Sequence, residues 1–172
     1  MTRPARPLVL LGAAVVLALG AFVGLRLLTA EADTTVAGPQ CVDRTVKTGE
    51  QLTSNLVKVN VYNVSQRSGL ANRVSINLQR RGFLAGEIGN LQTKIRPGRA
   101  TIVTNTPDDP QVLLVAAQLK GVKIRQPDTP IKDGVSVIIG DAYDGLKKGA
   151  DRTLTVSQPV TVCVPEVDTD GS

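Results

Sequence analysis

An uncharged apolar run near the N-terminus constrains this chain more than any other feature of its sequence. Residues 8–25 contain no charged side chain, and Leu27 and Leu28 extend the apolar stretch if the Arg26 side chain reaches towards the interface. At about 1.5 Å per residue, a helix over residues 8–28 spans roughly 31 Å, close to the hydrocarbon thickness of a bilayer. The run therefore predicts a single transmembrane helix.

The charges beside this run indicate its orientation. Arg3 and Arg6 precede it, which favours a cytoplasmic segment 1–7 and places the rest of the chain outside the cytoplasm. Ala30-Glu31-Ala32 resembles a signal-peptidase site, so cleavage before Asp33 stays open as an alternative. The run is longer than the 7–15 apolar residues usual in a signal peptide, and this favours a retained anchor in the cell membrane, followed by a tether over residues 29–39.

The composition excludes most common catalytic machinery. The chain has no histidine and only two cysteines, so it lacks histidine-based nucleophile pairs, histidine metal ligands and four-cysteine zinc sites. From Asp33 onward the chain carries 17 basic and 14 acidic residues, and the whole sequence has only four aromatic residues. That balance does not favour nucleic acid as a partner. We expect neither an enzyme nor a bound cofactor or metal.

The two cysteines, Cys41 and Cys163, both fall on the exported side. An exported pair with no other partner predicts a disulfide, although two reduced thiols remain the alternative. The bridge would close a loop of about 122 residues and stabilise the fold by about 4 to 5 kcal/mol on the chain-entropy model.

Periodicity in the exported part predicts an α/β domain over residues 40–165, followed by a disordered tail over residues 166–172. The first half contains a strand near residues 41–47, an alternating strand over 58–62, a helix over 69–81 with Ser68 as its N-cap, and a strand over 84–91. The second half contains a strand over 100–104 and a helix that begins around 106–110 with Asp108 and Asp109 and continues to Gly121. Strands over 122–124 and 135–140 follow, with one or two more within 154–164.

This order of elements predicts the architecture. Strand, polar loop, helix, glycine and strand occur once from Val59 and again from Thr101. The alternation favours an α/β sandwich, a mixed β-sheet with two main helices packed on it and a core within residues 58–145.

Short motifs in this core resemble the LytR C-terminal domain family. The family pattern is V-x-N-G-[ST], then G-L-A, a helix, and L-x-x-x-G-[FY]. The matching residues are Val61-Tyr62-Asn63-Val64-Ser65, Gly69-Leu70-Ala71, Leu78 and Gly82-Phe83. Val64 departs from the glycine usual in the first motif. The likeness continues to Gly145 and so covers about half of the chain.

The resemblance implies a role in maintaining the cell envelope, as in actinobacterial envelope integrity proteins with one membrane helix and this single domain. It implies no phosphotransferase activity, because about 30 residues between the anchor and the first matching strand leave no room for the family's usual catalytic neighbour.

Two functions remain open. In the first, a membrane-anchored, non-catalytic extracytoplasmic domain supports envelope integrity by binding a cell-wall polymer or an envelope protein. In the second, the domain carries or sequesters an apolar envelope lipid. An open cavity lined by valine and leucine would favour the second function, and a solid core with a polar groove would favour the first.

One loop is a candidate ligand contact. Ser65, Arg67, Ser68, Gly69 and Arg73 surround the start of the first helix, with no acidic residue between Lys58 and Arg81. Free amide groups at a helix N-terminus and nearby arginines suit a phosphate or carboxylate. In the alternative reading, Ser68 only caps the helix and the arginines are solvated. We read Arg80-Arg81 and Lys147-Lys148 as solvated surface, with contacts to an anionic envelope polymer or lipid as the alternative.

Overall fold

The computed structural model describes residue 20, residues 41–130 and residues 132–165. Apart from Gly20, the predicted transmembrane helix, the tether and the C-terminal tail lie outside these residues. None of the helices within the described residues has the length and apolar composition needed to cross a membrane.

The described residues contain strands and helices close to those predicted. The strands are β1 (Cys41–Val46), β2 (Gln51–Thr53), β3 (Lys58–Asn63), β4 (Leu84–Asn90), β5 (Ala100–Val103), β6 (Val122–Arg125), β7 (Val135–Ile139), β8 (Thr153–Thr155) and β9 (Val160–Pro165). The helices are α2 (Leu70–Gln79), α3 (Pro110–Gln118) and a short 3-10 helix, η1 (Ser54–Leu56). Strand β2 and the helix η1 are additions, because three-residue elements carry too little periodicity to be recognised in a sequence.

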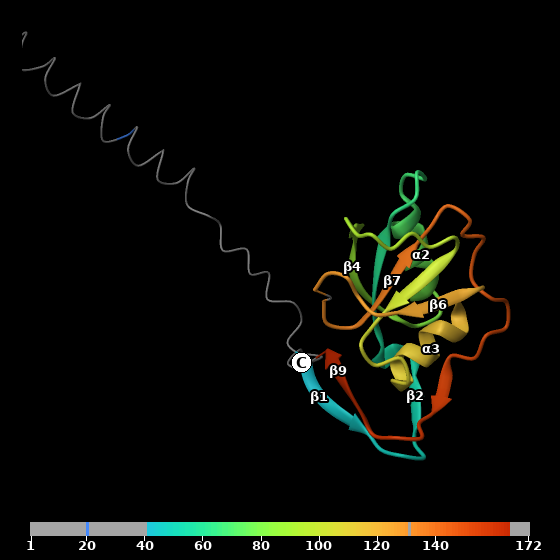
Figure 1. Ribbon diagram of the computed structural model, residues 1–172. Helices are drawn as coiled ribbons and strands as arrows, with labels where there is room; N and C mark the ends of the chain where they lie inside the picture. The colour runs from blue at the N-terminus through green and yellow to red at the C-terminus, as the bar shows by residue number, and fades with distance from the viewer. Residues whose placement is uncertain (1–19, 21–40, 131, 166–172) are drawn as a thin grey trace, which may run out of the picture. The chain divides into compact units, whose positions relative to one another are not determined.

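Five strands form the central sheet in the order β4-β3-β7-β5-β6, and the sheet is mixed, as predicted. Strand β3 runs parallel to β4 and β7, whereas β5 is parallel to β6 and antiparallel to β7. The two strand–helix–strand units therefore run in opposite directions on either side of β7. Right-handed crossovers then place both helices on one face of the sheet. Figure 1 shows α2 and α3 together behind the sheet.

The helix-covered face of the sheet forms the core. Alternate residues of β3, β7 and β5 pack against buried side chains of both helices in one hydrophobic cluster. Its members from these three strands are Val59, Val61, Val135, Val137, Ile139, Ala100 and Ile102, and its members from the two helices are Leu70, Ala71, Val74, Leu78, Val112, Leu114 and Val115. Because these side chains fill the space between sheet and helices, the interior is a packed apolar core.

The opposite face of the sheet is also buried, but under loops. The segment after β4 runs in front of the sheet in Figure 1. It is fixed there by hydrogen bonds from the Gly140 amide to the Arg99 carbonyl (2.8 Å) and from the Ala142 amide to the Gly98 carbonyl (2.7 Å). Beneath the loops, Asn60 is only 1% exposed. Half of the sheet's buried surface is therefore covered by irregular backbone.

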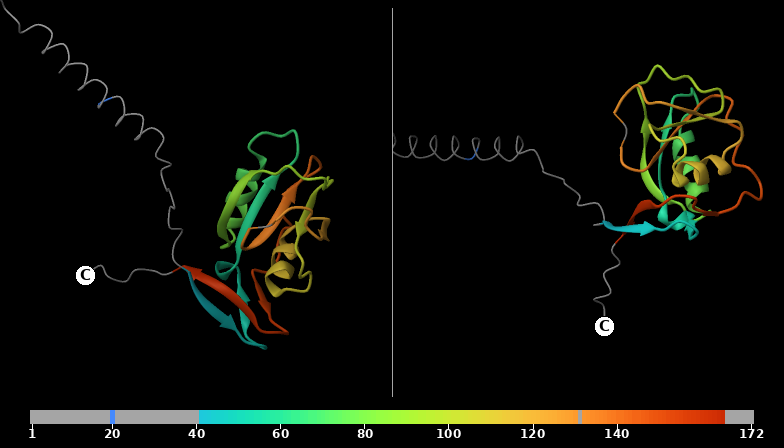
Figure 2. Two further views of the ribbon diagram at one scale, coloured as in Figure 1. Left: turned by 60° about the vertical axis from the view of Figure 1, so that its left-hand side comes forward. Right: turned by 60° about the horizontal axis from the view of Figure 1, so that its bottom comes forward.

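Two antiparallel ribbons extend the fold beyond the central sheet. Strand β1 pairs with β9, and β2 pairs with β8. Figure 2 shows the β1–β9 ribbon projecting from one end of the sheet. Its inner residues Val46, Val160 and Val162 join the hydrophobic core, so the ribbon is anchored to the domain.

The two helices begin differently. Helix α3 starts as predicted: Asp109 is its N-cap, and the Asp109 carboxylate accepts a hydrogen bond from the Gln111 amide at 2.7 Å. The prediction that Ser68 caps the other helix is wrong. Helix α2 starts at Leu70, and its N-cap is Gly69, with a φ of 70°. Glycine adopts this left-handed conformation without strain, so the chain turns there and leaves Ser68 one residue outside the cap position.

Candidate functional site

Basic side chains gather around a cavity of about 530 Å³ beside the β5–β6 edge of the sheet. Five of its lining residues are basic, namely Lys94, Arg96, Arg99, Lys123 and Arg125, and Asp128 is the one acidic residue. A neighbouring cavity of about 590 Å³ shares Lys94, Arg96 and Asp128 and reaches Val64 and Gln66. We call these two adjoining cavities the basic groove.

The fold explains why these charges meet. Lys123 and Arg125 are alternate residues of the edge strand β6, opposite Thr101 and Val103 of β5, so they lie on the loop-covered side of the sheet. The segment that carries Lys94, Arg96 and Arg99 crosses the same side. The groove is therefore formed by one strand and one loop more than 20 residues apart in the sequence.

Asp128 connects the two covering loops. Its carboxylate accepts hydrogen bonds from the Thr93 hydroxyl at 2.7 and 2.8 Å and from the Lys94 amide at 2.8 Å. The Thr93 hydroxyl, the Lys94 amide and the Lys94 charge hold the pKa of Asp128 below its usual value. The single carboxylate of the groove therefore stays ionised at neutral pH and acts as a tie between loops.

The basic groove concentrates the charge of the domain. Its five basic residues and one acidic residue give it a formal charge of +4. From Asp33 onward the chain carries 17 basic and 14 acidic residues, so the remainder has 12 basic and 13 acidic residues and a formal charge of −1. Among the described residues, no carboxylate oxygen lies within 4.0 Å of any of these five cations. Their charge is available to an anionic ligand.

The loop predicted to touch a ligand is largely closed by its own hydrogen bonds. The Asn63 side chain accepts from the Ser65 amide at 3.0 Å and the Ser65 hydroxyl at 2.7 Å, and it donates to the Arg67 carbonyl at 2.9 Å. The Arg67 guanidinium donates to the Tyr143 carbonyl at 2.8 Å. Ser68, Gly69 and Arg73 are exposed.

An acidic residue that is distant in the sequence joins this loop. The Asp141 carboxylate accepts from the Gln66 amide at 2.9 Å. None of the five predicted contact residues lines the basic groove, but Gln66, which stands between Ser65 and Arg67, does. The structure thus places the predicted loop at the far end of the groove.

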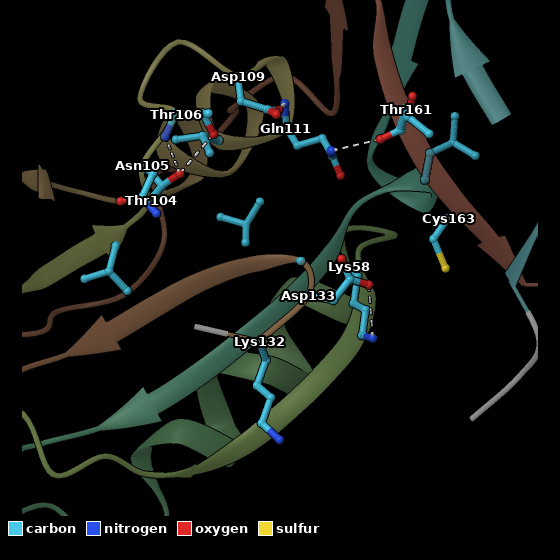
Figure 3. A pocket seen from close by; sticks show the side chains of 15 residues that line it. Lys58, Thr104, Asn105, Thr106, Asp109, Gln111, Lys132, Asp133, Thr161 and Cys163 are labelled. Carbon is cyan, nitrogen blue, oxygen red and sulfur yellow. Dashed lines mark hydrogen bonds and ion pairs between the residues drawn. The ribbon is translucent and has the colours of Figure 1, made fainter. Parts of the chain in front are cut away.

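A third cavity, of about 330 Å³, lies between the start of α3 and strand β9 (Figure 3). Most of its polar side chains already have partners. Lys58 pairs with Asp133 at 3.9 Å, Asp109 caps α3, and the Gln111 side-chain amide donates to the Thr161 carbonyl at 3.3 Å. Its charges also balance, with Lys58 and Lys132 against Asp109 and Asp133. This cavity therefore offers a ligand much less than the basic groove does.

The sequence contained a partial signal for the groove. Lys123 and Arg125 alternate along a short strand, which places them on one face. Nothing in residues 94–99 shows that this loop crosses that face, because its position depends on contacts with Gly140 and Asp128. The sequence therefore identified the basic residues but did not show that they lie close together in the fold.

Comparison with known proteins supports the resemblance seen in the sequence. The family described as LytR cell envelope-related transcriptional attenuator (LytR_C) matches residues 56–143. No curated protein matches the chain. A crystal structure of the soluble domain of a conserved hypothetical secreted protein from Mycobacterium marinum is similar, with 21% identity, a TM-score of 0.48, and coverage of 60% of this chain and 79% of that chain. The family match includes β3, α2, β4, β5, α3, β6 and β7, which build the central sheet and its two helices, and on this ground the chain belongs to the LytR_C family of cell envelope-related domains.

Proposed function

We propose that this protein is a membrane-anchored, non-catalytic extracytoplasmic domain that supports envelope integrity by binding an anionic component of the cell wall. The observation that carries the proposal is the basic groove, where five cations with no carboxylate partner among the described residues stand against one carboxylate. Such a concentration of one sign of charge in a cleft attracts and retains anions. Family membership supports the envelope as the place where the ligand is met.

The alternative, an apolar lipid carrier, has less support. The valine and leucine side chains of the helix-covered face are packed into the core, and the cavities described above are lined by charged and polar side chains as well as backbone. A lipid tail would need a large apolar cavity. The predicted contacts Ser65, Arg67, Ser68, Gly69 and Arg73 remain part of the binding proposal, as a second contact region beyond Gln66.

Reversing two charges of the groove tests the proposal. In the double variant Lys123→Glu/Arg125→Glu, the formal charge of the groove falls from +4 to 0. We expect the full chain, purified in an uncharged detergent, to lose at least about tenfold in affinity for polyphosphate in isothermal titration calorimetry. Both residues are exposed, so the fold is expected to persist.

A matched control has the same total change of charge elsewhere. Lys147 and Lys148 are exposed and lie outside the groove. We expect Lys147→Glu/Lys148→Glu to change the affinity by less than about twofold at 0.15 M salt, where screening limits distant charges. Equal losses in the two double variants would mean that net charge alone drives binding, and the groove would no longer be the site.

We also propose that Cys41 and Cys163 form a disulfide at the base of the domain. The register of the β1–β9 ribbon pairs Cys41 with Pro165 and Cys163 with Asp43, so the cysteines occupy neighbouring strands two positions out of register. Because the sequence has no other cysteine, this placement on adjacent strands supports a bridge between them. Alkylation of the denatured protein without reductant is expected to leave both cysteines unlabelled, and labelling of both would exclude the bridge.

A further inference from the structure

The two compartments of the basic groove differ in chemistry. The compartment beside β6 holds Arg99, Lys123 and Arg125 in addition to the shared Lys94 and Arg96. Among the described residues that line the second compartment, none but the shared ones is charged, and its polar side chains are those of Gln66, Gln92, Thr93 and Thr129. One compartment therefore suits anionic groups, and the other offers amide and hydroxyl groups.

Amide and hydroxyl side chains both donate and accept hydrogen bonds, which is what a hydroxyl-bearing ligand needs. Gln66 and Gln92 are exposed, and neither side-chain amide forms a hydrogen bond within the described residues. Thr93 is committed to Asp128. Two free amides thus face a compartment that a purely anionic ligand would not require.

The size of the groove also exceeds that of a single anion. Each compartment, at about 530 and 590 Å³, falls in the range of cavities that hold a whole small-molecule ligand. Lys123 and Arg125 are two residues apart on a strand, so their backbone positions are about 6.6 Å apart. The cations are therefore spread along the groove instead of converging on one point.

From this arrangement we propose that the groove binds a polymer whose repeating units carry both an anionic group and hydroxyl groups, such as a phosphodiester-linked polyol or an acidic glycan. The anionic groups contact Lys94, Arg96, Lys123 and Arg125, and a hydroxylated unit occupies the compartment of Gln66 and Gln92. This inference rests on the proposed function and specifies the class of ligand.

Length dependence is the first test. We titrate the full chain in uncharged detergent with glycerol 3-phosphate and with a synthetic hexamer of glycerol phosphate. Because the hexamer engages several cations at once, we expect it to bind about 100-fold more tightly than the monomer. Equal affinities would assign the groove to a single phosphate, as in a lipid headgroup, and would overturn the inference.

The second test separates hydroxyl recognition from charge. Gln66→Ala/Gln92→Ala leaves all charges in place, and we expect it to weaken hexamer binding by about tenfold through lost hydrogen bonds. Binding of polyphosphate, which has no hydroxyl-bearing units, is expected to stay unchanged. If the variant leaves both ligands unaffected or weakens both equally, hydroxyl recognition is excluded.

The two levels of the proposal fail in distinguishable ways. Suppose that Lys123→Glu/Arg125→Glu abolishes binding of the hexamer while Gln66→Ala/Gln92→Ala does not affect it. The proposal of an anionic ligand is then supported, and the proposal of a hydroxylated polymer is wrong. If Lys123→Glu/Arg125→Glu changes neither ligand's affinity, the basic groove is not the binding site and both proposals are wrong.

Discussion

Replacing Gly140 with alanine is expected to lower the free energy of unfolding by about 3 kcal/mol, because the added methyl group has no room. A Cβ atom at this position would lie 1.9 Å from the Pro97 carbonyl oxygen and 2.7 Å from that of Gly98. Both contacts are with backbone, so relief requires movement of the whole covering loop.

That movement would reach the basic groove, because the loop held against Gly140 carries Lys94, Arg96 and Arg99. We therefore expect Gly140→Ala to weaken polyphosphate binding as well as to shift the urea midpoint. Gly89→Ala in β4 is the control, since a Cβ there meets no atom within 4 Å. If the two variants unfold at the same urea concentration, the close approach at Gly140 does not stabilise the fold.

Replacing Asn60 with leucine is expected to destabilise the domain by about 4 kcal/mol, because several buried hydrogen bonds disappear together. The Asn60 side-chain amide donates to the Asp133 carbonyl at 2.9 Å and to the Ser136 hydroxyl at 3.3 Å. Its carbonyl oxygen accepts from the Glu87 amide at 2.8 Å. In the variant, these three groups would be left without their partner next to an apolar side chain.

The same contact explains an irregularity of β4. The pairing of β3 with β4 shifts register between Val59 and Val61, where Asn60 receives the extra backbone amide. A Cβ at Gly86 would lie 2.2 Å from the Asn60 oxygen, so only glycine fits. We expect faster hydrogen exchange at the Glu87 amide in Asn60→Leu.

Asn72→Leu provides the control for this substitution, because Asn72 is exposed on α2. Its expected effect is within about 0.5 kcal/mol. A loss of stability in Asn60→Leu no larger than in Asn72→Leu, measured by urea denaturation, would contradict the role of Asn60.

The sequence predicted the strands and helices well and the environment of the sheet's second face poorly. The alternation in residues 58–62 located β3 correctly, but it did not show that Asn60, on the other face of the strand, is buried. Alternation shows which residues share a face of a strand; it does not show what covers that face. Here loops cover it, and loops lack a periodic pattern that could reveal their path.

For the candidate site, too, the sequence predicted local structure but not the contacts between distant segments. The sequence showed that residues near Ser65 and Arg67 form a polar loop, but the hydrogen bonds from Gln66 to Asp141 and from Arg67 to Tyr143 join positions about 75 residues apart. The basic groove likewise needs β6 and a distant loop. Whether two distant segments lie side by side depends on tertiary contacts, which a local sequence pattern does not encode.

The β1–β9 ribbon has a mechanical consequence for the domain. Its strands are antiparallel, and Cys41 opposes Pro165 at the outer end while Val46 opposes Val160 at the end that joins the core. A pulling force applied between the two outer ends would break the hydrogen bonds of the ribbon one residue pair at a time, starting from the outer end. The ribbon would open in this way before the force acted on the central sheet. The ribbon would therefore yield under tension before the rest of the domain unfolds. A covalent link between its two strands would instead transmit the force and keep the ribbon closed.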